Sequence, residues 1–170
     1  MNQIANVVLD NILGRRSIRH FEKKTLNPAD LAMILQAGDA APSAGNLKSR
    51  KFFSITEATD LEFLIRYIFS RRIREEKRLF ANVPCILVIC ANLDSARKKY
   101  RRGRLYAIQD ATLAGQNMML MAHALGIGSC WIGQVRERQI VGKFGIDPDY
   151  QIVGLIALGY PLSNTDESLP

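Results

Sequence analysis

The long apolar stretch from Leu105 to Leu125 constrains the fold of this chain more than any other part of the sequence. It is rich in Ala, Met and Leu and is closed by Gly126 and Gly128, and its apolar residues would cover most of the circumference of a helix. Such a helix is expected to lie at the centre of the structure, covered by other elements. It also leaves apolar surface that one small subunit is poorly able to cover, which favours dimerisation.

A second constraint is the run Cys85–Ala91, which follows Pro84 and is apolar throughout, as in a strand buried on both faces. Apolar periodicity and capping residues predict further helices over 4–14, 27–40, about 61–68 (ending in the Arg- and Lys-rich segment 71–78) and 136–144. Three more strands are expected over 51–56, 129–135 and 151–160. Because helices separate the strands, these elements predict an α+β or α/β sandwich with both faces of the sheet covered.

The composition fits one globular domain. A chain of 170 residues with 48% hydrophobic residues is expected to form a single domain over residues 1–170. No run approaches the roughly 18 uninterrupted apolar residues that a spanning helix needs, so no membrane partner is expected. The N-terminus carries no export signal, which favours a cytoplasmic location. The three cysteines form no C-x-x-C pair, and His20 and His123 lie far apart, so neither a disulfide nor a metal site is expected.

The net charge of +7 is concentrated in one region of the chain. Residues 64–104 hold 12 Lys and Arg against 3 Asp and Glu, a net +9, so the remainder carries −2. A solvated helical face is the first interpretation, because it is the usual fate of a charge run. Steering of anionic substrates such as pyridine nucleotides toward a cleft is the second. Nucleic-acid binding is the weakest, because no aromatic-interleaved or zinc-finger pattern accompanies the charges, and no nucleic-acid partner is expected.

The segment Arg15-Arg16-Ser17-Ile18-Arg19 follows the first predicted helix and contains three guanidiniums and a hydroxyl but no carboxylate. Guanidinium groups bind phosphate through paired hydrogen bonds, and the hydroxyl adds another. The segment is therefore a candidate phosphate site, although by itself it fits a basic turn with solvated side chains better.

Two further segments offer backbone groups to a ligand. Pro42-Ser-Ala-Gly-Asn46 joins a helix to a strand; its small side chains let the backbone approach a flat ring, and Asn46 can donate and accept at a pyrimidine edge. Residues 125–135, LGIGSCWIGQV, place a glycine-rich turn before a strand, so that N–H groups around Ile132 and Gly133 are placed to face a ligand. No G-x-G-x-x-G follows a strand here, so this is not a dinucleotide-binding fingerprint. Each segment by itself also fits an ordinary turn or strand entry.

In their order, these segments resemble one family, the FMN-dependent nitroreductases. The resemblance spans roughly residues 4–161 and rests on RRSIRHF after a helix, PSAGN before a strand, LYAIQDATLAGQNMMLMAHALGIGSCWIG, and ALGYP near the end. Each motif is permissive, but four in register make coincidence improbable. The resemblance implies an α+β, three-layer sandwich whose central, mostly antiparallel sheet is flanked by helices, in a homodimer with two FMN sites at the subunit interface.

The resemblance also implies which residues hold FMN. Positions that contact the flavin's phosphate, ribityl chain or pyrimidine edge are matched by Arg15 and Ser17, with Arg16 beside them. A basic position near the N1/O2 edge of the flavin is matched by Arg19. A loop from the partner subunit would reach the isoalloxazine ring through Pro42, Ser43, Ala44 and Asn46. The ring's other face and edge, where a backbone N–H approaches flavin N5, would lie along Trp131, Ile132 and Gly133.

By the same resemblance, the chain is expected to pass hydride from NADH or NADPH to an organic small-molecule acceptor by a ping-pong mechanism. Nitroaromatics, quinones and flavins are the acceptor classes implied. The flavin carries the chemistry, so no protein nucleophile or general base is expected, and hence no catalytic residue. A non-catalytic relative that binds flavin or another anion is the alternative.

The chain departs from the family pattern at three points. Many members continue PSAGN with Gln-Pro-Trp, where this chain has Lys48-Ser49-Arg50. After GYP many members carry a Lys-x-Arg phosphate clamp, whereas residues 162–170 contain no Lys or Arg. The phosphate charge is then expected to be met by Arg15 and Arg16 or, as a second choice, by residues 101–106, RRGRLY. The chain is also short for the family, which implies a more open substrate pocket.

Overall fold

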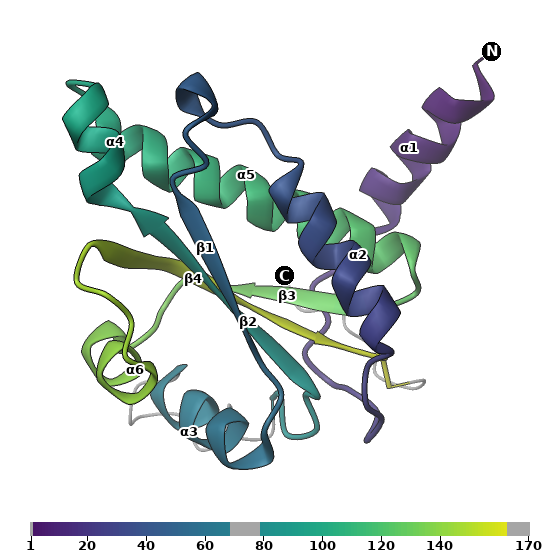
Figure 1. Cartoon of the computed structure of the whole chain (residues 1–170). Coiled ribbons are helices and arrows are strands. Elements are labelled where there is room, and N and C mark those ends of the chain that lie inside the picture. The colour runs from purple at the N-terminus through teal and green to yellow at the C-terminus, as the bar shows by residue number, and fades with distance from the viewer. Residues whose placement is uncertain (1, 69–78, 163–170) are drawn as a thin grey trace.

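A four-stranded antiparallel sheet forms the centre of the molecule (Figure 1). The computed structural model describes residues 2–68 and 79–162. Within them the strands lie in the order β1-β2-β4-β3, and each neighbouring pair is antiparallel. The strands are β1 (Arg50–Ile55), β2 (Cys85–Asn92), β3 (Gly128–Ile132) and β4 (Tyr150–Gly159). Every residue of the run 85–91 is buried in β2, as its apolar sequence predicts.

Helices cover both faces of this sheet, which makes three layers (Figure 1). One face carries α2 (Pro28–Asp39), α4 (Leu93–Lys99) and α5 (Gly103–Ala124), and the other carries α3 (Ala58–Ile68) and α6 (Glu137–Phe144). Alternate residues of β2 enter the two cores, because successive side chains of a strand point to opposite faces. Leu87 belongs to the buried cluster that contains Met118 of α5, and Val88 to the one that contains Leu64 and Ile140. The predicted α+β sandwich with both sheet faces covered is therefore confirmed.

The helix α1 (Gln3–Gly14) projects from this sandwich and has no buried residue (Figure 1). Its apolar side chains are exposed, with 74% of Ile4 and 62% of Leu13 accessible to solvent. Asn11 ties the helix to α5, because its side-chain amide donates to the Leu120 carbonyl at 3.0 Å. A contiguous apolar face of this kind is unfavourable in water and marks a surface that another element or chain covers.

The predicted helices and strands are present, with two differences. The helix α4 was not indicated, because Leu93–Lys99 has no apolar stripe; it begins where the Asn92 side chain accepts from the Ser95 N–H at 2.9 Å. The strand expected over 129–135 ends at Ile132. The basic segment 71–78 lies outside the described residues. In the described part of the chain, no helix combines the length and apolar character that crossing a membrane requires.

Candidate functional site

The arginine-rich segment after α1 is fixed to one corner of the sheet. Ser17 pairs with Ser129 at the start of β3, and the Ile18 N–H donates to the Ser129 carbonyl at 2.9 Å. A few residues further on, Phe21 pairs with Pro161, just after β4. The segment therefore crosses the corner where β3 begins and β4 ends, and its backbone position is set by the sheet.

The candidate side chains of this segment are engaged to different extents. Arg16 is exposed, and its guanidinium donates to the carbonyls of Leu13 at 2.6 Å and Arg15 at 3.0 Å, so it caps the last turn of α1. Arg19 is half-buried and donates to the Ser17 carbonyl at 3.2 Å. Arg15 and Ser17 are also half-buried. The corner thus gathers guanidinium and hydroxyl donors of the kind that bind phosphate.

The PSAGN loop, which follows α2, has an unusual backbone. Ala44–Asn46 forms a single 3-10 turn, η1, that is interrupted at Gly45. The φ angles of Gly45, Asn46 and Lys48 are all positive, at 56°, 54° and 48°. Glycine adopts this left-handed conformation freely, whereas a residue with a side chain does so at a cost of order 1 kcal/mol or more. The surrounding contacts must therefore hold the loop in this shape.

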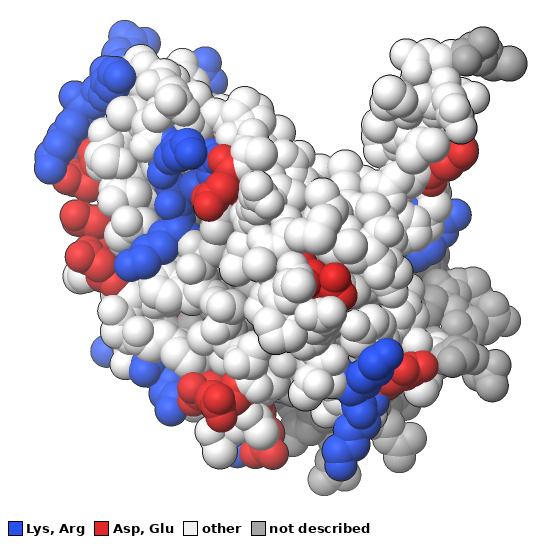
Figure 2. Space-filling view, turned by 45° about the vertical axis from the view of Figure 1, so that its right-hand side comes forward, with Lys and Arg blue, Asp and Glu red and all other residues white. Residues whose placement is uncertain are grey.

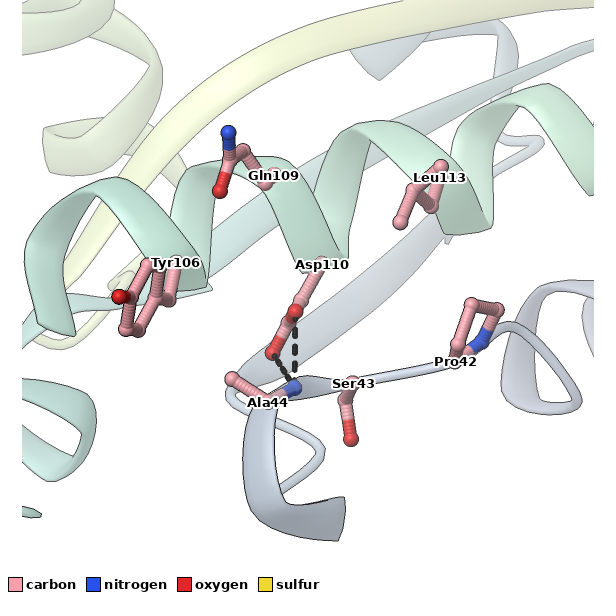
Figure 3. A pocket seen from close by; sticks show the side chains of 7 residues that line it. All are labelled: Pro42, Ser43, Ala44, Tyr106, Gln109, Asp110 and Leu113. Carbon is pink, nitrogen blue, oxygen red and sulfur yellow. Dashed lines mark hydrogen bonds between the residues drawn. The ribbon is translucent and has the colours of Figure 1, made fainter.

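A buried carboxylate of α5 supplies one of these contacts (Figure 3). Asp110 is 5% exposed, and each of its carboxylate oxygens accepts from the Ala44 N–H at 3.1 Å. Inside the loop, the Ser43 hydroxyl accepts from the Lys48 N–H at 3.0 Å. Hydrogen bonds from a backbone N–H to an ionised carboxylate are among the stronger ones in proteins. Asp110 therefore fixes the middle of the loop to the central helix.

A buried arginine at the start of β1 supplies a second contact. Arg50 is 8% exposed, and its guanidinium donates to the carbonyls of Ala41 at 2.7 Å, Asp39 at 2.8 Å and Pro42 at 3.3 Å. Its Nε atom has no hydrogen-bond partner among the described residues. The guanidinium thus satisfies carbonyl groups that the end of α2 leaves unpaired, and it fixes the entry to the loop. Arg50, where the chain departs from the family pattern at residues 48–50, therefore holds the entry to the PSAGN loop.

An open cavity of about 370 Å³ lies between the loop and α5. Its lining residues are Pro42, Ser43, Ala44, Tyr106, Gln109, Asp110 and Leu113 (Figure 3). Proline, alanine, leucine and tyrosine groups dominate the walls, with a few polar groups among them. Small-molecule sites have this composition and size. The cavity is therefore suited to part of a flat organic ring.

The Trp131 side chain is half-buried and packs against the core. Its indole packs between Gly115 of α5 and Gly154 of β4, and a Cβ on either glycine would collide with the ring. Ile132 is 8% exposed and belongs to the core on the opposite face of the sheet. Gly133 is exposed, and a Cβ built there would meet only the indole nitrogen of Trp131, at 3.7 Å. Of these three residues, Gly133 alone is exposed.

Two of the buried thiols, those of Cys85 and Cys90, are poor nucleophiles near neutral pH. Burial raises the pKa of Cys85 to about 12. Burial, with a smaller contribution from the nearby Glu137 carboxylate, likewise raises the pKa of Cys90 to about 12. Both side chains therefore remain protonated, and the thiolate is the reactive form. Among residues 2–68 and 79–162, no group of His, Cys, Asp and Glu is arranged to hold a metal ion.

The arginine segment and the PSAGN loop lie at opposite ends of α5 (Figure 1). Gly14, which ends α1, packs against His123 near the C-terminal end of α5. Asp110, which holds Ala44, lies in its N-terminal half. With a rise of about 1.5 Å per helical residue, positions 110 and 123 are about 20 Å apart. Within one chain, the two segments therefore lie beside different ends of the central helix.

Comparison with protein families decides the relationship, because the model of the nitroreductase family matches residues 12–160. The chain belongs to the nitroreductase family. The resemblance seen in the four sequence motifs is thereby confirmed.

Relatives in this family cover nearly the whole chain. A protein of Archaeoglobus fulgidus, provisionally named NADH dehydrogenase/NAD(P)H nitroreductase, is 28% identical over 163 residues, or 93% of this chain and 87% of that protein. The FMN reductase (NADPH) of Bacillus subtilis is 27% identical over 97% of this chain and 71% of its own length. Among solved structures, an FMN-dependent nitroreductase from Clostridium difficile is similar with a TM-score of 0.77 and 25% identity, over 92% of this chain and 89% of that one.

The sequence patterns did not indicate two residues that hold the PSAGN loop, namely Asp110 and Arg50. A signal for Asp110 exists, because it is the one carboxylate in the stretch from Leu105 to Leu125. A lone acid among apolar residues of a buried helix needs a hydrogen-bond partner. The role of Arg50 has no local signal, since it depends on the end of α2 folding back beside β1.

Proposed function

We propose that this chain is an NAD(P)H-dependent FMN oxidoreductase that acts as a homodimer. Each FMN lies in the seam between two copies, held by the arginine segment of one and the PSAGN loop of the other. The names of two relatives, an FMN reductase and an FMN-dependent nitroreductase, support this choice of cofactor.

The separation of the two segments along α5 is the observation that carries the proposal. In a two-fold symmetric pair, the same surface of each copy faces the other. If α5 lies across the axis, one end of α5 in one copy faces the opposite end of α5 in the other. The arginine segment of one chain then meets the loop of its partner, twice in each dimer. Such a pairing would also cover the exposed apolar side chains of α1 and of Leu105 and Leu113 on α5, which are 40% and 47% exposed.

The chemical groups at the two segments are of the types that bind FMN. Guanidinium and hydroxyl donors at Arg15 and Ser17 suit an anionic phosphate. Gly133 is exposed, and Ser43 and Ala44 of the PSAGN loop are small enough to let a flat ring approach the backbone. Arg16 adds positive charge near the phosphate while its guanidinium caps α1.

The residues of the chain bind and orient, whereas FMN, when bound, accepts hydride from the dihydronicotinamide and passes electrons on to the acceptor. Arg19 places positive charge beside the pyrimidine edge, where it offsets negative charge that develops on reduction. Asp110 and Arg50 keep the PSAGN loop rigid against the ring. Donor and acceptor use the same open face in turn, which favours flat, electron-poor acceptors such as nitroaromatics, quinones or flavins.

Reconstitution with FMN tests the function. We expect a yellow protein that is bleached by NADH or NADPH without oxygen and regains its colour when a quinone or nitroaromatic is added. The double variant Arg15→Ala/Ser17→Ala is expected to bind FMN at least about tenfold more weakly, because it loses a charged and a neutral phosphate contact. A colourless protein that FMN cannot reconstitute contradicts the proposal.

A non-catalytic flavin- or anion-binding role is the second candidate. Two observations favour it: the Arg16 guanidinium is engaged with α1, and residues 162–170 contain no Lys or Arg. Protein that retains FMN but oxidises neither nucleotide with any of these acceptors would support this role over the oxidoreductase.

A further inference from the structure

Most of the cations at the junction of α4 and α5 have no carboxylate partner. Residues 97–104 contain six Lys and Arg, and one of them, Lys98, pairs with Asp94 at 2.5 Å. The other five form no ion pair with any carboxylate of the described residues; we call them the cationic corner: Arg97, Lys99, Arg101, Arg102 and Arg104. Figure 2 shows Lys and Arg gathered over this part of the surface, at the upper left. Unpaired cations held close together repel one another, so an anion that binds there gains from several at once.

The cationic corner adjoins the PSAGN loop directly. The Tyr100 hydroxyl lies against Gly45 in the loop, where it occupies the space that a Cβ would take. The Lys99 Nζ atom is 3.5 Å from that same Cβ position. The cationic corner therefore borders one side of the PSAGN loop.

Two tyrosines connect the cationic corner to the cavity. The rings of Tyr100 and Tyr106 meet edge to face, with centroids 5.7 Å apart. The Arg102 guanidinium lies 5.9 Å from the centre of the Tyr106 ring, and Tyr106 lines the cavity together with Pro42 and Ala44. If a ligand places a flat ring in the cavity, the part of that ligand outside the cavity would therefore lie near Arg102 and Lys99.

We propose that the cationic corner binds the phosphate groups of the pyridine nucleotide whose nicotinamide ring enters the cavity. This inference rests on the proposed oxidoreductase function and assigns the donor's phosphates a site in it. Arginine forks match phosphate oxygens. The Arg102 guanidinium is 5.9 Å from the centre of the Tyr106 ring, which lines the cavity, and this is within the screening length of about 8–10 Å at ordinary salt. The site favours a small polyanion with a ring over a nucleic acid, because its charge is continuous with a cavity of about 370 Å³ that one ring can fill.

The test compares charged and uncharged hydride donors on the FMN-loaded protein. The double variant Lys99→Ala/Arg102→Ala is assayed with NADPH, NADH and 1-benzyl-1,4-dihydronicotinamide, which has a nicotinamide ring but no phosphate. We expect the ratio of kcat/KM for NADPH to kcat/KM for the benzyl compound to fall about tenfold, mainly through KM, and less for NADH because it carries fewer negative charges. The matched control is Arg138→Ala on α6, an exposed arginine on the other face of the sheet, for which the ratio should stay within about twofold.

Ionic strength gives a second readout. Added salt should lower kcat/KM for NADPH in the wild-type protein more steeply than in the Lys99→Ala/Arg102→Ala variant. An unchanged ratio and an unchanged salt slope, while both donors still reduce the flavin, overturn this inference and leave the proposed function standing. Weakened binding of duplex DNA in the variant, with the donor ratio unchanged, also overturns it, because the corner is then a nucleic-acid surface. If no donor reduces the flavin, the proposed function fails as well.

Discussion

Asp110 and Arg50 show how single side chains set the shape of the PSAGN loop. The loop contains two non-glycine residues with positive φ, and its middle and entry are fixed by one buried carboxylate and one buried guanidinium. Strained backbone persists where surrounding contacts over-determine it, and such places are frequently functional. In the proposed function, the loop would already have its binding shape before FMN arrives, which would reduce the entropy lost on binding.

Substitution of Asp110 tests this role. Alanine removes the acceptor for the Ala44 N–H, whereas asparagine keeps an oxygen in nearly the same place. We expect Asp110→Ala to weaken FMN binding about tenfold and Asp110→Asn to stay within about threefold, since the lost bond is worth roughly 1–2 kcal/mol. Fluorescence titration of FMN measures both.

Thermal unfolding of the FMN-free variants separates positioning from general destabilisation. A merely structural role for Asp110 would lower the melting temperature of the alanine variant while the folded protein bound FMN as tightly as wild type. That result would contradict the positioning role.

At the scale of elements, α1 stands out because none of its residues is buried in the part of the chain that the structure describes. Asp10 is its one charged residue, and the rest of its surface is mainly apolar. In the proposed dimer this helix packs against the partner chain. In this proposal, the apolar sequence of α1 would serve association as well as helix formation.

A charge placed on α1 should break the dimer without unfolding the subunit. Val8 is 53% exposed, so a glutamate there costs little in the isolated chain but would be buried in the dimer. We expect Val8→Glu to produce a monomer with a wild-type circular dichroism spectrum and greatly weakened FMN binding. Light scattering during gel filtration measures the mass, and Gln3→Glu, at the exposed start of the helix, is the control. A Val8→Glu protein that stays dimeric and yellow would argue against α1 as the interface.

The elements were predictable from sequence where burial on more than one side requires many apolar residues. The continuous apolar run of β2 and the apolar residues around most of α5 are of this kind, and both elements appear at the expected places. The helix α4 was missed because its short, basic sequence has no apolar stripe, and its start depends on one cap at Asn92. The apolar pattern of a sequence predicts which segments are buried. Whether a short exposed helix forms depends instead on its capping residues.

The candidate site was predictable only in part. The arginine segment and the loop carry local signals in residue type and spacing. The contacts that hold the loop join residues far apart in sequence; Asp110 and Ala44 are 66 positions apart. The apolar periodicity of a sequence does not predict contacts between residues so far apart. For the same reason it does not predict that the Trp131 indole fills the space left by Gly115 and Gly154.

At the scale of the whole molecule, the proposed function requires a dimer in which neither chain holds a complete site. The arginine segment and the PSAGN loop of one chain lie about 20 Å apart along α5, so in this proposal each would serve a different flavin. The cationic corner follows the loop and would serve the partner's flavin too. Function would then depend on association, and activity should fall at protein concentrations where the dimer dissociates.

Complementation between two defective chains tests this claim most directly. One chain carries Arg15→Ala/Ser17→Ala and the other Ser43→Ala/Asn46→Ala; each homodimer is expected to bind FMN poorly. Coexpression with two different affinity tags allows the mixed dimer to be isolated, and bound FMN and NADPH oxidation are then measured per dimer. The account predicts about half of the wild-type values, because one of the two shared sites contains only unaltered residues. A mixed dimer no better than either parent would show that each site is built within a single chain.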